Sequence, residues 1–121
     1  MDEFTIRVPR EPRFAAVTGL VLGGVAARHD LTLEALDDLQ LALDSLLERT
    51  SGDGDVTIVL QVDGGILLAS VGPLAADTAG ELEREADESL GLRRLLDTVV
   101  DGVTVSDRDG GPWVELRKGF A

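Results

Sequence analysis

The chain has 121 residues, of which 44% are hydrophobic, 28% are charged and only 3% are aromatic. This length corresponds to one domain with enough apolar residues to bury a core, which excludes intrinsic disorder. The 23 acidic and 11 basic residues give a net charge of −12, which excludes direct binding to nucleic acid, because affinity for phosphates comes from Lys and Arg. With no cysteine, the chain has no disulfide, thiolate metal site or cysteine nucleophile. It also shows no signal-peptide pattern and no apolar stretch long enough to span a bilayer, so we expect a cytoplasmic protein.

The first part of the chain predicts a strand followed by a helix. Residues 4–8 alternate between apolar and polar side chains and stop at Pro9, which is typical of a strand at a sheet edge. Residues 11–29 predict a helix, because apolar side chains recur there at helical spacing. Phe14, Val17, Val21 and Val25 are expected on one stripe of this helix.

Three glycines lie inside this first predicted helix, at Gly19, Gly23 and Gly24. Each costs about 1 kcal/mol relative to alanine in a helix interior, so their presence needs a reason. Close packing against a neighbouring helix, a partner surface and a local break in the helix all remain open. Packing is the interpretation we favour.

The central helix, predicted for residues 33–50, organises the rest of the chain. Thr32 is the expected N-cap, with Leu31 before it and Leu36 inside it as a hydrophobic staple. The side expected to face the core carries Leu36, Leu39, Leu43 and Leu46, and the opposite side carries Asp37, Gln40, Asp44 and Glu48. The glycine- and aspartate-rich residues 51–55 are expected to end this helix.

Two hairpins follow from alternating apolar patterns and glycine turns. The first joins strands at residues 55–62 and 66–71 through Asp-Gly-Gly, a sequence that supplies the positive φ angles of a tight turn. The second joins strands at residues 103–106 and 113–117 through another Asp-Gly-Gly.

The segment between the two hairpins predicts a loop and a third helix. Residues 72–89 form the loop, with a short helix at 81–88, and residues 90–100 form the third helix. Its apolar face consists of Leu92, Leu95, Leu96 and Val99. The element order therefore predicts a single domain over residues 1–121 with an α+β two-layer sandwich: a mostly antiparallel, mixed sheet covered on one face by three helices.

Several segments carry a resemblance to a known family. They are residues 38–43 (DLQLAL), residues 91–95 and 99–103, and the closing residues 111–118. Taken in this order and spacing, they resemble the anti-sigma factor/serine-protein kinase (RsbW-like) group of the GHKL ATPase superfamily. The resemblance runs over nearly the whole chain and implies a histidine-kinase-like ATPase domain of the GHKL (Bergerat) fold, whose ligand is ATP with Mg²⁺.

The residues that would bind ATP in that family are replaced in this chain. The activating glutamate falls on Ser45 and the Mg²⁺-holding asparagine on Arg49, neither of which can do that chemistry. The aspartate that reads adenine falls on Val71, and the glycine motif on the phosphate side survives only in Gly91 and Leu92. We therefore predict a degenerate ATP site, with no catalytic residue, no cofactor and no bound metal. Shifting the alignment by one residue brings in Asp44 or Glu48, but no frame restores both the acid and the asparagine.

The resemblance also implies a protein partner. The family binds its partner through the first helix and dimerises through the first strand, so a homodimer is an open option. A family arginine on the first helix falls on Ala16, and Arg13 lies one turn away on the same helix. Arg13, Phe14 and Val17 are therefore the predicted partner-binding residues.

The predicted function is that of a non-catalytic regulator of transcription that binds a sigma factor or a STAS-type antagonist. Two alternatives remain open. One is an ATP-dependent serine-protein kinase and anti-sigma factor with a divergent nucleotide site. The other is a non-catalytic protein that dimerises with an active paralogue.

Simpler readings stand beside these hypotheses. Arg49 is equally explained by local pairing with Glu48 or Asp53, and Gly91 by the start of a helix. The single His29 has no second histidine or cysteine near it in the sequence, so a structural role is favoured. Trp113 is expected to pack on the sheet. The acidic residues 77–88, which correspond to the ATP lid of the family, are expected to be solvated. Residues 53–55 (DGD) favour a turn over a calcium loop, because the later acidic ligands are missing.

Overall fold

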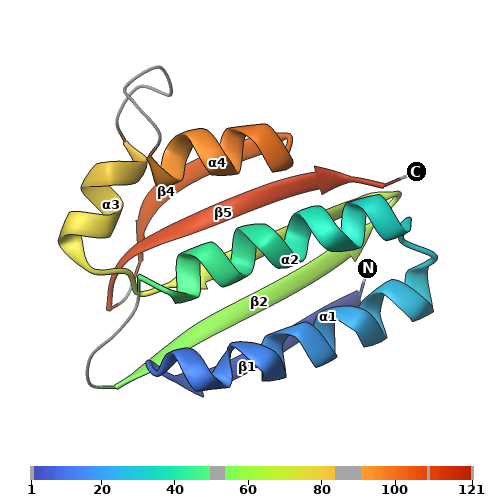
Figure 1. The fold of residues 1–121 in the computed structure, drawn as a ribbon, viewed down its shortest axis with the longest axis horizontal. Coiled ribbons are helices and arrows are strands. Elements are labelled where there is room, and N and C mark those ends of the chain that lie inside the picture. The colour runs from blue at the N-terminus through green and yellow to red at the C-terminus, as the bar shows by residue number, and fades with distance from the viewer. Residues whose placement is uncertain (1, 50–53, 84–90, 109, 121) are drawn as a thin grey trace.

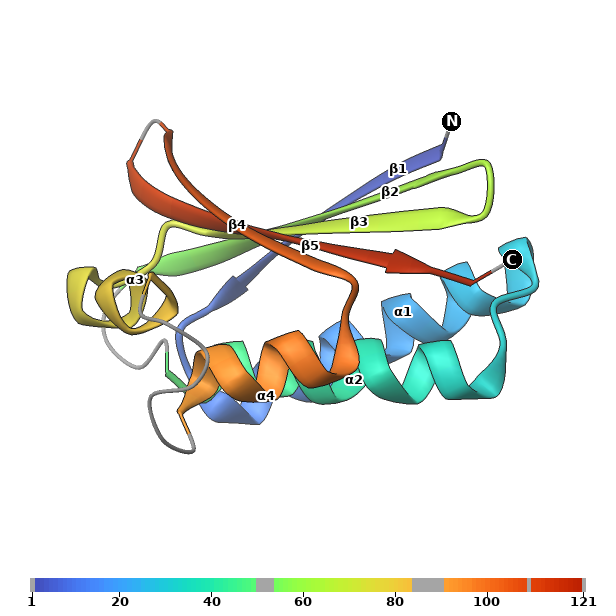
Figure 2. The same cartoon turned by 90° about the horizontal axis from the view of Figure 1, so that it is seen from above.

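The structure is a computed structural model that describes residues 2–49, 54–83, 91–108 and 110–120. Its strands β1 (Asp2–Pro9), β2 (Asp55–Asp63), β3 (Ile66–Gly72), β4 (Gly102–Arg108) and β5 (Gly111–Gly119) form one five-stranded sheet. The order is β1-β2-β3-β5-β4, and every neighbouring pair is antiparallel. Helices α1 (Ala15–His29), α2 (Leu33–Leu47) and α4 (Leu92–Val99) lie side by side on one face of this sheet, and no described helix covers the other face (Figures 1 and 2). The predicted α+β sandwich is confirmed.

Two details of the predicted architecture were wrong. The sheet is antiparallel throughout rather than mixed, because the chain reaches the far edge at β4 and returns through a hairpin to place β5 beside β3. The described residues also contain a fourth α-helix, α3 (Ala76–Leu82), at one end of the helical layer (Figure 2). None of the described helices is long and apolar enough to cross a membrane.

The predicted edge strand is β1 (Asp2–Pro9), which pairs only with β2 (Asp55–Asp63). Alternation places Phe4 and Ile6 toward the helices, opposite Leu60 and Ile58. The odd-numbered side chains of β1 point to the open face of the sheet. Strand β3 (Ile66–Gly72) follows a turn in which two glycines have φ values of 59° and 84°, as the Asp-Gly-Gly sequence predicts.

The first helix begins with a 3-10 turn, η1 (Pro12–Phe14), and continues as α1 (Ala15–His29). Of the predicted stripe, Val25 is buried, Phe14 and Val21 are half-buried against the core, and Val17 is 39% exposed. The buried residues of α1 are Thr18, Leu22, Val25 and Ala26. Two physical reasons account for the offset between the stripe and the buried side. The helix is apolar on nearly all sides, so hydrophobicity does not mark its inner face, and the tighter 3-10 turn shifts the phase of Phe14 relative to α1.

The central helix is α2 (Leu33–Leu47), which ends three residues before the predicted end at residue 50. The Thr32 hydroxyl caps it by accepting a hydrogen bond from the Ala35 N–H at 3.1 Å, as predicted. Leu39, Leu43 and Leu46 are fully buried under the sheet, and Leu36 is half-buried against the same core. Of residues 51–55, which were expected to end the helix, 51–53 lie outside the described residues.

The short predicted helix at residues 81–88 was placed too late. Helix α3 (Ala76–Leu82) starts five residues earlier, and residues 84–88 lie outside the described residues. Its buried Thr78, Ala79 and Leu82 follow helical spacing. The sequence pattern missed it because alanine, threonine and glycine carry too little hydrophobic contrast to reveal a period.

The C-terminal part contains α4 (Leu92–Val99), β4 (Gly102–Arg108) and β5 (Gly111–Gly119), close to the predicted elements. One lysine connects the sheet to the helical layer. The Lys118 side chain points from β5 toward the helices, and its Nζ donates to Asp38 Oδ2 of α2 and to the Val99 carbonyl of α4, each at 2.9 Å. This contact fixes α2 and α4 relative to the sheet.

Candidate functional site

The exposed side of α1 carries no charge before Arg28. Between Phe14 and Ala27 the sequence contains no charged residue, although 28% of the whole chain is charged. We use the name α1 face for the exposed residues Arg13, Ala16, Val17, Leu20, Gly24 and Ala27. At its centre Leu20 is 78% exposed and Val17 is 39% exposed. An apolar helix face left uncovered by the protein's own fold is typical of a protein-binding surface.

Arg13 marks one end of the α1 face. Its side chain is 76% exposed, its Nε lies 2.7 Å from Glu11 Oε2, and its guanidinium sits 4.9 Å from the centre of the Phe14 ring. Phe14 itself is half-buried and packs against the core. Of the three predicted partner-binding residues, the structure therefore places Arg13 and Val17 on the surface, and Phe14 beneath Arg13 as its support.

The three glycines of α1 have different surroundings. A Cβ atom at Gly19 would lie 2.9 Å from the Gln40 Nε2, so packing against α2 accounts for this glycine. A Cβ atom at Gly23 or Gly24 would meet nothing within 4 Å, so packing inside the chain does not explain them. The helix also runs without a break from Ala15 to His29. Of the three explanations for Gly23 and Gly24, this leaves a close approach by a partner.

Sequence analysis missed Leu20 and Gly24 as members of this face. The available signal was the run of 14 residues without charge, which includes both of them. The predicted stripe excluded both residues, because it followed the spacing of the valines.

The residues at the family's nucleotide positions do not line one cavity. Val71 is fully buried and pairs with Ile58 and Val114 in the sheet, so its side chain is part of the core. Leu92 is also buried. The Ser45 hydroxyl donates to the Leu41 carbonyl of its own helix at 2.8 Å. The degenerate ATP site stays a prediction.

Arg49, which follows the end of α2, pairs with Glu81 and not with its neighbour Glu48, so the expected pairing with Glu48 was wrong. The other expected partner, Asp53, lies outside the described residues. Arg49 Nη1 lies 2.9 Å from Oε2 and 3.1 Å from Oε1 of Glu81, and so joins the end of α2 to α3. A cavity of about 370 Å³ beside this ion pair is lined by Arg49, Asp77, Thr78 and Glu81. Two carboxylates face one guanidinium there, which disfavours an added phosphate.

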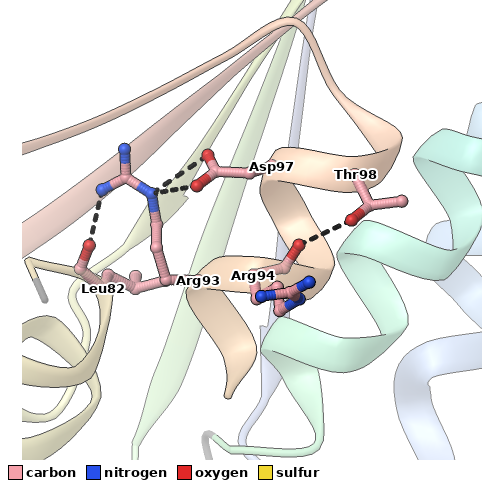
Figure 3. A network of polar contacts seen from close by, with 5 residues as sticks. All are labelled: Leu82, Arg93, Arg94, Asp97 and Thr98. Atoms are coloured by element: carbon pink, nitrogen blue, oxygen red, sulfur yellow. Dashed lines mark hydrogen bonds and ion pairs between the residues drawn. The ribbon is translucent and has the colours of Figure 1, made fainter. Parts of the chain in front are cut away.

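Gly91 is the N-cap of α4 with φ −81° and ψ 177°, an extended conformation that any residue adopts. The simpler reading of Gly91 as a helix start is therefore confirmed. Figure 3 shows how α4 is anchored nearby: Arg93 Nη1 donates to the Leu82 carbonyl of α3 at 2.6 Å, and its Nε lies 3.1 Å from both Asp97 oxygens.

Two carboxyl groups have shifted acidities. Burial raises the pKa of Asp44, and the negative charge of Glu48 one turn away raises this pKa further. For Asp2, partial desolvation acts to raise the pKa, but the nearby Arg28 and His29 outweigh it and the pKa is lowered. His29 Nε2 lies 2.8 Å from Asp2 Oδ2 and Arg28 Nε lies 3.0 Å from it, so these contacts join the end of α1 to β1.

Two remaining expectations concern the sheet and metals. Trp113 packs directly on Gly72 across the open face of the sheet, with Arg108 5.0 Å from its ring centre, so the predicted sheet-packing role is confirmed. Within the part of the chain that the structure describes, no group of three or more His, Cys, Asp or Glu side chains is placed to hold a metal ion.

Comparison with known proteins gives a partial match. No protein-family model matches the chain. Over an alignment of 64 residues, the chain is 27% identical to the serine-protein kinase RsbW of Listeria monocytogenes serotype 4a and to that of Listeria innocua serovar 6a. The alignment covers 47% of this chain and 41% of each relative, so the chain matches less than half the length of these relatives. The similarity suggests a distant RsbW-like relationship.

Proposed function

We propose that this protein is a regulatory module that acts like an anti-sigma factor, binding a sigma factor or a STAS-type antagonist through the α1 face. One observation carries this proposal: apart from Arg13 at its end, the α1 face is uncharged, and it exposes Leu20 by 78% in a chain with a net charge of −12. The core of a protein interface is more apolar than the rest of a protein surface and is depleted of charged residues, as this face is.

The net charge of the whole chain favours a partner with basic residues. The chain has 23 acids against 11 bases, and long-range attraction speeds association with an oppositely charged protein. Arg13, at one end of the face, would receive an acidic group of the partner in place of Glu11. The distant similarity to RsbW supports the same class of function.

The proposal includes the absence of kinase activity. Its support is that Val71 and Leu92 are core residues, and that the Arg49 guanidinium is held by Glu81. Ser45 offers no carboxylate to activate a hydroxyl group, and Arg49 offers only donors, which cannot coordinate Mg²⁺.

The partner proposal is tested by co-purification. Each sigma factor and each STAS-domain protein of the source organism is expressed with a tag and mixed with the purified chain. We expect one of them to retain the native chain but not Leu20→Asp. The matched control is Leu33→Asp, because Leu33 is 73% exposed on α2 and an aspartate at a helix start is favourable. Retention of Leu20→Asp at the native level, or retention of the native chain by none of them, contradicts the proposal.

A second candidate function is that of an ATP-dependent serine-protein kinase with a divergent site, which the similarity to the serine-protein kinase RsbW favours. Thermal unfolding with Mg-ATP separates the two. A ligand at 100 times its Kd stabilises the folded state by about 2.7 kcal/mol, so bound ATP raises the melting temperature by several degrees. We expect no shift and no transfer of labelled phosphate to a STAS-domain protein. Phosphate transfer above background establishes the kinase instead.

We further propose a homodimer through the free edge of β1. If two copies of β1 pair antiparallel about Thr5, Glu3 of each copy lies opposite Arg7 of the other on the open face of the sheet. Charge reversal tests this arrangement by analytical ultracentrifugation. Glu3→Arg and Arg7→Glu should each weaken the dimer, and the double variant should restore it. A native chain that stays monomeric at high concentration rejects the dimer.

A further inference from the structure

Helix α2 and its C-cap carry a row of acidic side chains along the border with α1. A Cβ atom at Gly19 of α1 would lie 2.9 Å from Gln40 Nε2, so Gln40 marks the side of α2 that borders α1. Asp37 and Asp44 lie about one turn before and one turn after Gln40. Glu48 follows Asp44 by one further turn, so these carboxylates share the same side. We use the name acidic row for Asp37, Asp44 and Glu48.

The fold supplies no positive charge to the acidic row. Asp37 and Glu48 are exposed, Asp44 is half-buried, and none of the three forms an ion pair with the described residues. Helix α2 contains no basic residue, and α1 is uncharged between Phe14 and Ala27. The raised pKa of Asp44 agrees with this, because burial and the charge of Glu48 act on it without an opposing cation. Three uncompensated negative charges therefore lie beside the α1 face.

The part of α1 next to the acidic row is apolar and has little side-chain bulk. Gly23 lies one turn after Gly19, on the side of α1 that borders α2, and Ala27 lies one turn after Gly23. A Cβ atom at Gly23 would meet nothing within 4 Å. Leu20, which is 78% exposed, stands beside this line of small residues. A partner can therefore approach the α1 backbone closely here, with Leu20 as its main apolar contact.

The arrangement of the two helices favours a helix as the binding segment of the partner. Helices α1 and α2 lie side by side, so the apolar strip and the acidic row both run along the helix axes (Figure 1). An amphipathic helix has the same two features, since it presents an apolar stripe at i, i+3, i+4 and i+7 with charged residues along one flank. An extended segment would turn every second side chain away from this surface.

We propose that the partner binds through a basic amphipathic helix along the border of α1 and α2, with aliphatic side chains on Leu20 and Lys or Arg against the acidic row. This inference rests on the proposed function, because the α1 face is one half of the surface. Phosphate-bearing ligands are disfavoured, since the acidic row repels them. A second copy of this chain fits less well, because its own apolar helix carries no basic residue between Phe14 and Ala27.

The test uses designed peptides, whose chemistry is stated in advance. The probe is a fluorescein-labelled helical peptide of about 15 residues, with leucines at positions i, i+4, i+7 and i+11 and lysines along one flank. A second peptide has glutamate in place of lysine, and a third has the composition of the probe in scrambled order. Fluorescence anisotropy with the full chain gives the affinities, and amide NMR shifts locate the site.

We expect the native chain to bind the lysine peptide saturably, with amide shifts at Leu20, Gly24 and Asp37, and with an affinity that falls as salt is added. Leu20→Asn should weaken binding about 10-fold through the loss of a central apolar contact. Asp37→Lys/Asp44→Lys should shift the ratio of the two affinities about 10-fold toward the glutamate peptide.

The matched control for charge is Glu34→Lys/Asp107→Lys. Both double variants replace two acids with two lysines, so they raise the net charge of −12 equally. Glu34 lies one turn before Asp38, whose contact with Lys118 marks the α4 side of α2, and Asp107 is exposed on β4. The control should keep the native preference for the lysine peptide. Circular dichroism of each variant checks that its helices are intact.

The outcomes separate this inference from the proposed function. If Leu20→Asn weakens binding but Asp37→Lys/Asp44→Lys keeps the native preference, the basic helix is refuted and the α1 face remains the binding surface. Absence of binding, equal binding of the scrambled peptide, or native affinity in Leu20→Asn also overturns the inference. So does a concentration-dependent dimer that Leu20→Asn abolishes, which assigns the surface to a second copy. The proposed function is decided independently, by co-purification with sigma factors and STAS-domain proteins.

Discussion

Replacing Gly24 with alanine should make the protein more stable and a poorer binder. Gly24 lies inside α1, is exposed, and has no atom within 4 Å of the position where a Cβ would be placed. Alanine is favoured over glycine in a helix interior by about 0.8–1.0 kcal/mol, mainly because it restricts the unfolded chain. No clash offsets this gain, and the exposed methyl group adds little burial. The expected increase in the free energy of unfolding is therefore about 1 kcal/mol.

The gain is measured by urea unfolding, followed by circular dichroism and by the emission of the single tryptophan, Trp113. With a urea m-value of about 1–3 kcal/mol/M, the midpoint should rise by roughly 0.3–1 M with an unchanged slope. Two other glycines are the controls. Gly80→Ala in α3 also meets nothing within 4 Å, whereas Gly19→Ala must displace the Gln40 side chain and should gain less.

The binding measurement separates a role for a partner from a neutral glycine. If a partner packs on the backbone at Gly24, the added methyl group overfills that interface at a cost of about 1–3 kcal/mol, which is a loss of affinity of roughly 5- to 150-fold. Gly80→Ala should bind normally at similar stability. Native affinity in Gly24→Ala would refute the inference that a partner explains this glycine. Lower stability in Gly24→Ala would refute the described environment itself.

Three further predictions concern charged residues. Asp44→Asn should stabilise the fold at pH 7 by a few tenths of a kcal/mol, because it removes a partly buried carboxylate and its repulsion from Glu48. The pKa of Asp44 is raised in the folded state, so the difference in stability between variant and native chain should vanish in acid, where the native Asp44 is protonated. Asp2→Asn should destabilise the fold at pH 7, because it removes the contacts with Arg28 and His29. The pKa of Asp2 is lowered in the folded state, so the extra stability of the native chain is complete above the unfolded pKa of 3.8. It should disappear as the pH falls through the folded pKa. Lys118→Met should cost roughly 1.5–3 kcal/mol, because it removes charged hydrogen bonds to α2 and α4. Urea unfolding at several pH values checks all three, and equal midpoints for variant and native chain at pH 7 would contradict each of them.

The sheet and the central helix could be predicted because their signals are local. Alternating strands and two Asp-Gly-Gly turns define the hairpins, and the glycine φ angles agree with them. The leucine stripe and the Thr32 cap define α2. In each case a few adjacent residues show either a contrast between apolar and polar side chains or a required backbone angle, and this is enough to predict the element.

The orientation of α1 and the position of α3 could not be predicted in the same way. Helix α1 is apolar all round, so which side is buried depends on its packing against α2 and the sheet. Helix α3 has too little hydrophobic contrast to show a period. The contact between Lys118 and Asp38 joins residues 80 positions apart, and Arg49 pairs with Glu81 across 32 positions. Such pairs follow from the fold, and no local sequence pattern predicts them.

The candidate site shows the same division. Arg13 and Val17, which the family resemblance predicts to bind a partner, lie on the surface. Leu20 was not predicted, because its exposure is a consequence of how α1 rotates on the sheet. The residues at the nucleotide positions could be judged for their chemistry alone. Their separation in space, with Val71 in the core and Arg49 paired with Glu81 of α3, required the structure.

The order of helices in the layer explains why the α1 face is exposed. Helix α2 packs against α1 on one side and against α4 on the other (Figures 1 and 2). Lys118 fixes both α2 and α4 to β5. Helix α1 therefore lies at the outer edge of the layer, and no described helix packs against its far side. A partner that extends from the α1 face across α2 would meet the outer side of α2, which carries Asp37 and Asp44. A basic segment of the partner is favoured at that place, because it would be attracted to these carboxylates.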